Sequence, residues 1–216
     1  MSAIKYIIPF AVFLHCSSTI SEERPLVLKE IMTNNETDKV IIYIQNLSQE
    51  QKDFYWKDTI ENADGYFEYE PDSSSNQIHL IDEMYLISNK INITTDIFLD
   101  KQHPKNTIKK FADSANKIIY FVESDYGVLM LTKWDLVADK AKIYIVNDFL
   151  NVKIPELTGT LTLIKDKKNL NKCIWQLNWI LNNIQYELTL PDKLDSQRKP
   201  LLNREKILDF IKNNIL

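Results

Sequence analysis

A histidine with carboxylates close by in the sequence can act as a general acid–base pair, and one such group occurs here. His79 is followed by Asp82 and Glu83. Side chains three positions apart on a strand point to opposite faces, so the pair needs a helix or a turn. The composition of residues 78–87 instead favours a strand. A hydrolase that uses His79 or carboxylates is therefore an alternative function rather than the leading one.

A group of carboxylates surrounds Gly65. Its members are Glu61, Asp64, Glu68, Glu70 and Asp72. Calcium prefers carboxylate oxygens, but a calcium loop needs them at a fixed spacing. That spacing is missing from the sequence, as are the histidine and cysteine motifs of zinc sites. The sequence therefore favours a solvated acidic loop, and we expect no metal.

The motifs for nucleophiles and phosphate binding give weak or negative signals. Residues 114–117 (Ser-Ala-Asn-Lys) match the S-x-x-K pattern, but the companion K-T-G segment is missing. The chain has three glycines, each isolated, so the sequence contains no glycine-rich loop of the kind that cradles nucleotide phosphates. We therefore expect neither a catalytic serine of this class nor a cofactor.

The charge balance bears on the class of partner. The formal net charge is −4, from 26 basic and 30 acidic residues. Proteins that bind nucleic acids carry a basic patch or stripe. The acidic balance argues against a nucleic-acid partner and leaves protein and small-molecule partners open.

Tryptophans are the remaining candidates for ligand or partner contact. Trp175 and Trp179 alternate with polar residues in 173–181, so they share one strand face. That face could line a ligand groove, although core packing is favoured because burying each indole contributes roughly 2–3 kcal/mol. Trp56 ends a run of aromatic residues on a predicted helix, whose rings point in different directions. It is therefore a candidate for contact with a partner.

The N-terminus has the pattern of an export signal. Lys5 precedes the mostly apolar run 6–14, and His15, Cys16 and two serines follow it. A basic residue, a short apolar run and small residues are the three parts of a secretory signal. The run is less than half the roughly 20 apolar residues that a membrane-spanning helix needs.

The position of Cys16 resembles a bacterial lipoprotein signal, in which the chain is cleaved before a cysteine that carries acyl chains. The resemblance covers residues 5–18 and departs from the pattern at His15, where Gly, Ala or Ser is usual. It implies that Cys16 is the lipid attachment site and that a membrane is a partner through this anchor. Cleavage near 17–21 without lipid, and an uncleaved apolar N-terminus, stay open as alternatives.

The predicted organisation is a signal peptide at 1–15, a tether at 16–25 and a single domain at 26–216. The tether is polar and ends at a proline, which suits a solvated linker. The remaining chain is long enough for one domain with a sizeable core. With Cys16 carrying lipid, Cys173 is left as an unpaired thiol, and its strand-like surroundings predict burial.

Helix and strand signals alternate in the first half of the chain. The β-branched run 39–45 predicts a strand, and a capping box at 48–51 predicts a helix over 49–62. A second helix is predicted at 108–115 from the i, i+3, i+4, i+7 spacing of its apolar residues. Weaker strand patterns cover 66–69, 78–87 and 91–99.

From residue 117 onward, apolar and polar residues alternate as they do in half-buried strands. The predicted strands are 118–122, 127–134, 140–147, 157–163, 173–181 and 184–190. Short connections, including the turn at Asn182 and Asn183, imply antiparallel pairing with one wet face. Asn203 then caps a terminal helix. The predicted fold class is α+β: an antiparallel β-sheet of five or more strands, a meander in the C-terminal half, packed with two or three helices.

These patterns lead to one functional hypothesis with two alternatives. The leading hypothesis is a lipoprotein of the cell envelope, anchored through Cys16. Its domain has a non-catalytic binding or scaffolding role towards an unknown protein or small molecule. One alternative is a secreted or periplasmic inhibitor or immunity-type module. The other is the hydrolase that uses carboxylates or His79.

Overall fold

The computed structural model describes residues 5–7, 40–44, 48–50, 52, 58–72, 75–90, 107–155 and 157–216. Cys16, the tether at 16–25, Trp56 and the strand predicted at 91–99 lie outside the described residues. The strands predicted between 118 and 190 lie within them and are all present.

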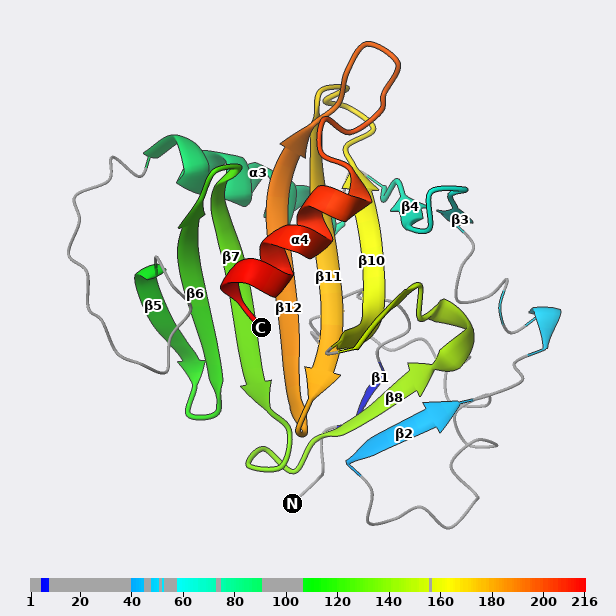
Figure 1. The fold of residues 1–216 in the computed structure, drawn as a ribbon, viewed down its shortest axis with the longest axis vertical. Helices are drawn as coiled ribbons and strands as arrows, with labels where there is room; N and C mark the ends of the chain where they lie inside the picture. The colour runs from blue at the N-terminus through cyan, green and yellow to red at the C-terminus, as the bar shows by residue number, and fades with distance from the viewer. Residues whose placement is uncertain are drawn as a thin grey trace.

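A mixed nine-stranded sheet forms the centre of the fold (Figure 1). Its order is β3 (Thr59–Glu61), β4 (Phe67–Tyr69), β10 (Leu157–Lys165), β11 (Lys172–Leu181), β12 (Ile184–Lys193), β7 (Gly127–Asp135), β6 (Lys117–Ser124) and β5 (Thr107–Ser114), with β9 (Val152–Ile154) also paired to β10. Neighbouring strands are antiparallel except for the parallel pair β4–β10. The predicted α+β class with a large C-terminal sheet is confirmed, and the β4–β10 pair makes that sheet mixed.

A second sheet of three strands is entirely parallel. Its order is β1 (Lys5–Ile7), β8 (Lys142–Val146) and β2 (Ile41–Ile44). The strands predicted at 39–45 and 140–147 are confirmed by β2 and β8. The antiparallel pairing predicted for 140–147 is wrong, because β8 leaves the main sheet and pairs in parallel with β1 and β2. Ile143 of β8 packs with Trp134 and Ile180, so this small sheet covers one end of the main sheet. A 3-10 turn, η1 (Asn147–Phe149), follows β8.

Helices cover opposite faces of the main sheet. α4 (Arg204–Asn214) crosses β11 and β12 in Figure 1, and its Ile207 and Ile211 belong to the same core cluster as Trp175. α3 (Asn76–Lys90) packs Ile81 against Ile174, the neighbour of Trp175 in β11, so it lies on the other face. Within the described ranges, no helix is both long and apolar enough to cross a bilayer.

The cap predicted for the terminal helix is confirmed. The side-chain oxygen of Asn203 accepts a hydrogen bond from the backbone nitrogen of Lys206 at 3.0 Å. The turn predicted at Asn182 and Asn183 is also confirmed, because both residues have positive φ, at 53° and 61°. These angles match the tight hairpin turn that asparagine tolerates, and they connect β11 directly to β12.

Two predictions of element type are wrong. Residues 108–115, predicted as a helix, lie almost entirely in β5, because the segment pairs with β6. Register shifts near both ends of this pairing disturb the alternation of side chains that would have indicated a strand. Residues 78–87, predicted as a strand, lie in α3, where Ile78, Ile81 and Met84 recur at helical spacing on the buried face. Short apolar windows fit both periods, and tertiary pairing decides between them.

The helix predicted over 49–62 is wrong at its C-terminal end. Residues 59–61 form β3, whereas 49, 50 and 52 are helical as predicted. β3 pairs with β4, and β4 in turn pairs with β10 of the C-terminal sheet. Pairing to a distant part of the chain therefore overrides the local helix signal.

Gly159 of β10 is required by the close approach of β11. A Cβ at this position would lie 2.3 Å from the backbone oxygen of Asn178 and 3.1 Å from the Cβ of Trp179. We predict that Gly159→Ala lowers the free energy of unfolding by about 2 kcal/mol or more, since the strands must move apart. Urea denaturation checks this, with Thr158→Ala as the control at the neighbouring exposed position. Equal stability of the two variants would contradict the packing described here.

Candidate functional site

Trp175 and Trp179 are both buried, at 1% and 3% exposure. The indole nitrogen of Trp175 donates to Oδ2 of Asp192 at 3.0 Å, and Tyr66 meets the Trp175 ring edge-on at 4.7 Å. Trp179 stacks on Tyr186 with ring centroids 5.1 Å apart. Trp175 is thus a core residue with a satisfied polar end, whereas Trp179 also borders a cavity described below.

Cys173 and Asp192 lie beside these rings. Cys173 is a free, buried cysteine, and burial raises the pKa of its thiol well above the ordinary value, with the nearby Asp192 adding to the shift. The predicted buried, unpaired thiol is confirmed. Asp192 also accepts hydrogen bonds from the backbone nitrogens of Lys193 and Leu202, and its carboxyl pKa is raised by burial.

The candidate acid–base group lies on the outside of α3. His79, Asp82 and Glu83 are exposed, and the helix places both carboxylates one turn from the histidine. Asp82 forms an ion pair with Lys172 of β11 at 2.9 Å. The S-x-x-K match falls on the β5–β6 hairpin, where Ser114 pairs in register with Lys117. Neither His79 nor Ser114 lines the cavity or the void described below, whereas Lys117 borders that void together with Glu187.

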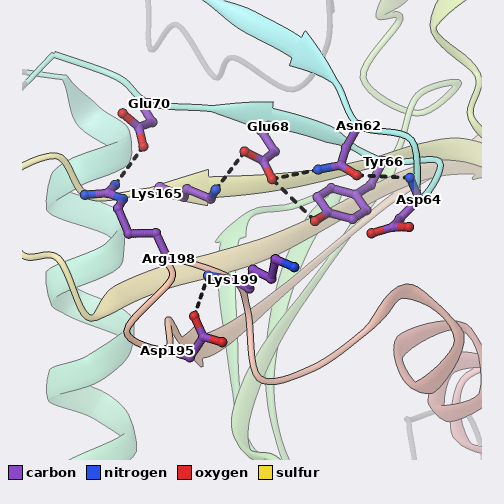
Figure 2. A network of polar contacts seen from close by, with 9 residues as sticks. All are labelled: Asn62, Asp64, Tyr66, Glu68, Glu70, Lys165, Asp195, Arg198 and Lys199. Atoms are coloured by element: carbon purple, nitrogen blue, oxygen red, sulfur yellow. Dashed lines mark hydrogen bonds and ion pairs between the residues drawn. The ribbon is translucent and has the colours of Figure 1, made fainter.

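The acidic cluster around Gly65 is joined to the C-terminal half by ion pairs (Figure 2). Glu68 pairs with Nζ of Lys165 at 2.7 Å, and Nδ2 of Asn62 donates to the same carboxylate at 3.0 Å. Glu70 pairs with Arg198 at 2.7 Å. These contacts fasten the β3–β4 segment to β10 and to the loop after β12. Within the described ranges, no group of three or more histidine, cysteine or acidic residues is placed to hold a metal ion.

A band of polar side chains runs across the face of the main sheet opposite α4. Strand register puts Thr160, Asn178, Glu187 and Thr132 in one row, and Thr162, Gln176 and Thr189 in the next, with Gln185 beside the first row. We call these eight residues the polar strip. All of them are buried, with at most 9% exposure. The apolar contacts of α3 lie at one end of the strip and those of β8 at the other.

Most residues of the polar strip have a buried side-chain polar atom that lacks a hydrogen-bond partner among the described residues. Six of its residues have a side-chain polar atom with no partner among the described residues: Thr162, Gln176, Asn178, Gln185, Glu187 and Thr189. Thr160 is an exception, because its hydroxyl donates to the backbone oxygen of Phe149 at 2.8 Å. Buried polar atoms are normally paired, since an unpaired one costs about 1–3 kcal/mol.

A cavity of about 90 Å³ opens between the small sheet and one end of the polar strip. Its apolar wall comes from β8, η1 and Tyr43. Its polar wall includes Thr160, Asn178 and Gln185, and Trp179 lies beside them. Gln185 also borders a tight void together with Glu187 and Lys117. This void has no room for a water molecule, so Gln185 lies between the cavity and the carboxyl group. An apolar pocket with a few convergent polar groups is the usual form of a small-molecule site.

Glu187 is the one titratable residue of the polar strip. It is 4% exposed, and its Oε2 has no partner among the described residues. Burial raises the pKa of this carboxyl to about 8, against the opposing effects of a hydrogen bond from Gln176 and the charge of Lys117. Lys117 is itself paired with Asp113 at 3.1 Å. Glu187 can therefore be a neutral donor at neutral pH or a buried negative charge above it.

The polar strip was not predicted from the sequence. Residues such as Thr162, Gln176 and Glu187 alternate with core residues, which predicts a wet face of an antiparallel sheet. The structure buries that face instead. The signal was the series of uncharged polar side chains, because a solvated face usually carries more charge. Comparison of the chain with protein-family models, with curated proteins and with solved structures finds no match.

The raised pKa of Glu187 predicts a pH-dependent stability. Its folded value of about 8 exceeds the ordinary value of 4.5, so its contribution is fully present below pH 4.5 and is lost as pH rises through 8. The free energy of unfolding should fall by about 4 kcal/mol across this window. In Glu187→Gln that fall should largely disappear, whereas the exposed Glu83→Gln should keep it. Urea denaturation at several pH values checks this, and parallel curves for wild type and Glu187→Gln would refute it.

Proposed function

We propose that the protein is a lipid-anchored protein of the cell envelope whose α+β domain binds a small ligand and has no catalytic role. The polar strip carries the binding part of this proposal. Two of its residues, Asn178 and Gln185, line the cavity with polar atoms that have no partner among the described residues, so a ligand in the cavity can pair with them. The apolar wall from β8 and η1 adds surface that a ligand can bury.

The hydrolase alternative has less support from the geometry. General acid–base catalysis needs two positioned groups or one group with an activated water. Glu187 is the single titratable member of the polar strip, and His79 is exposed on α3. A binding role needs only the hydrogen-bonding groups and the cavity.

The anchoring part rests on Lys5, the apolar run 6–14 and Cys16. Cleavage before Cys16 would remove β1 and leave β8 paired with β2 on its other side. The polar residues 16–25 would then connect the domain to the acyl chains, and two or more chains hold a protein stably on a bilayer.

The anchor predicts that Cys16→Ala abolishes both fatty-acid labelling and partition into the detergent phase. Cys173→Ala is the matched control, because it removes the only other cysteine and leaves the leader unchanged. It should retain the label. Wild type without label, or label retained in Cys16→Ala, would contradict the anchor.

The binding role predicts that a small molecule purifies with the native protein and is released on denaturation. Thr158 is exposed and lines the cavity, so Thr158→Trp should block the cavity and abolish co-purification. The control is Lys193→Trp, at an exposed position at the far end of β12. Mass spectrometry of the released fraction measures the outcome. No molecule from wild type, or equal amounts from wild type and Thr158→Trp, would count against the proposal.

A further inference from the structure

The unpaired groups of the polar strip are mostly acceptors. Four of them are carbonyl or carboxyl oxygens, on Gln176, Asn178, Gln185 and Glu187. The amide nitrogen of Asn178 is the one obligate donor in the strip, and the threonine hydroxyls can act either way. The indole nitrogen of Trp179, which also lines the cavity, is a second donor with no partner among the described residues. Gln176 forms a side-chain hydrogen bond with Glu187, and its amide oxygen has no partner among the described residues. A ligand that pairs with this surface must therefore be rich in donors.

The charge of the strip limits the class of donor further. Lys117 on β6 is the charged group that faces Glu187, and Asp113 compensates it at 3.1 Å. From β7 and β11 the described neighbours of Glu187 are Thr132, Gln176 and Asn178, which carry no charge. One buried carboxylate is too little charge for a divalent cation, which is usually held by several carboxylates. A monovalent cation balances the single negative charge of the Glu187 carboxylate.

The cavity gives such a group an apolar surrounding for its remaining atoms. Asn178 and Gln185 line the cavity, and Glu187 is next to both, opposite Asn178 of β11 and two positions after Gln185 in β12. The facing side consists of apolar residues of β8 and η1. A cationic nitrogen with an attached hydrocarbon fits both walls, because N–H groups satisfy the oxygens and the chain buries apolar surface.

On the premise of the proposed binding function, we infer that the ligand carries a protonated amine or guanidinium head group. This group lies against the acceptor oxygens of Asn178 and Gln185, and a rotation of the Gln185 side chain lets it form an ion pair with the adjacent Glu187. The polar strip is then unpaired only in the free protein. Binding also requires Glu187 to lose its proton, so affinity increases with pH until the carboxyl is ionised.

Titration calorimetry of the full chain in detergent, at constant ionic strength, tests the inference with three probes that share one hydrocarbon chain. Butylammonium and butylguanidinium carry the cationic head group, and 1-butanol has a neutral one. At pH 8.5 we expect at least one cation to bind about tenfold or more tightly than butanol. Lowering the pH from 8 to 6 should weaken that binding by up to about tenfold per unit, while butanol should be unaffected.

Glu187→Gln should weaken binding of the cation by about tenfold or more and remove its pH dependence. Glu83→Gln, on the exposed side of α3, should bind as wild type does. If Glu187→Gln does not fold, Gln185→Leu replaces it as the variant, and it should weaken the cation more than butanol.

Three results would overturn the inference. The first is an equal affinity for the cations and butanol, and the second is that no probe binds. The third is cation binding that is unchanged in Glu187→Gln, or in Gln185→Leu where that variant replaces it. The binding function itself fails separately, when no molecule co-purifies or when Thr158→Trp leaves co-purification unchanged. A co-purified molecule that is neutral would therefore refute the cationic head group while supporting the binding function.

Discussion

The pairing of β11 with β12 decides which side chains share each face of the sheet, and the other features follow from it. The turn at Asn182 and Asn183 fixes this pairing over ten residue pairs. A shift of β12 by one position against β11 would move Leu188 to the other face and bring Glu187 under α4. The apolar contacts of α4 therefore depend on a register that also assembles the polar strip.

Because of the same register, the two faces of the sheet contribute differently to the stability of the fold. On the α4 face, Trp175, Leu177 and Leu188 are at most 1% exposed and supply the hydrophobic stabilisation. On the opposite face, the polar strip stays buried with oxygens that have no partner in the described part of the chain, and this opposes folding by at least a few kcal/mol in total. A fold that keeps such a face retains a surface whose groups are desolvated and positioned in advance. These are the conditions under which hydrogen bonds to a ligand are strongest.

Elements with strict alternation and short connections could be predicted from the sequence. β6, β7 and β10–β12 follow from their two-residue period, and the capping role of Asn203 follows from its position before an apolar helical pattern. The windows at 78–87 and 108–115 were assigned wrongly, because their apolar spacing fits either period and the deciding contacts come from other parts of the chain. The pairing of β4 with β10 is equally non-local, since it joins residues almost a hundred positions apart. The polar strip and its carboxyl group were harder to predict from the sequence than the strands were. Glu187 is an ordinary alternating residue in the sequence, and only the burial of its whole face gives it an altered pKa.

The central claim is that the polar strip is a binding surface with Glu187 as its charged member. The most direct measurement is the titration of the Glu187 side-chain carboxyl by carbon NMR of selectively labelled protein, assigned with Glu187→Gln, in the absence and presence of butylammonium. The structure predicts a midpoint near pH 8 in the free protein and a lower midpoint with the cation bound. A midpoint near the ordinary value of 4.5, unchanged by the cation, would contradict it.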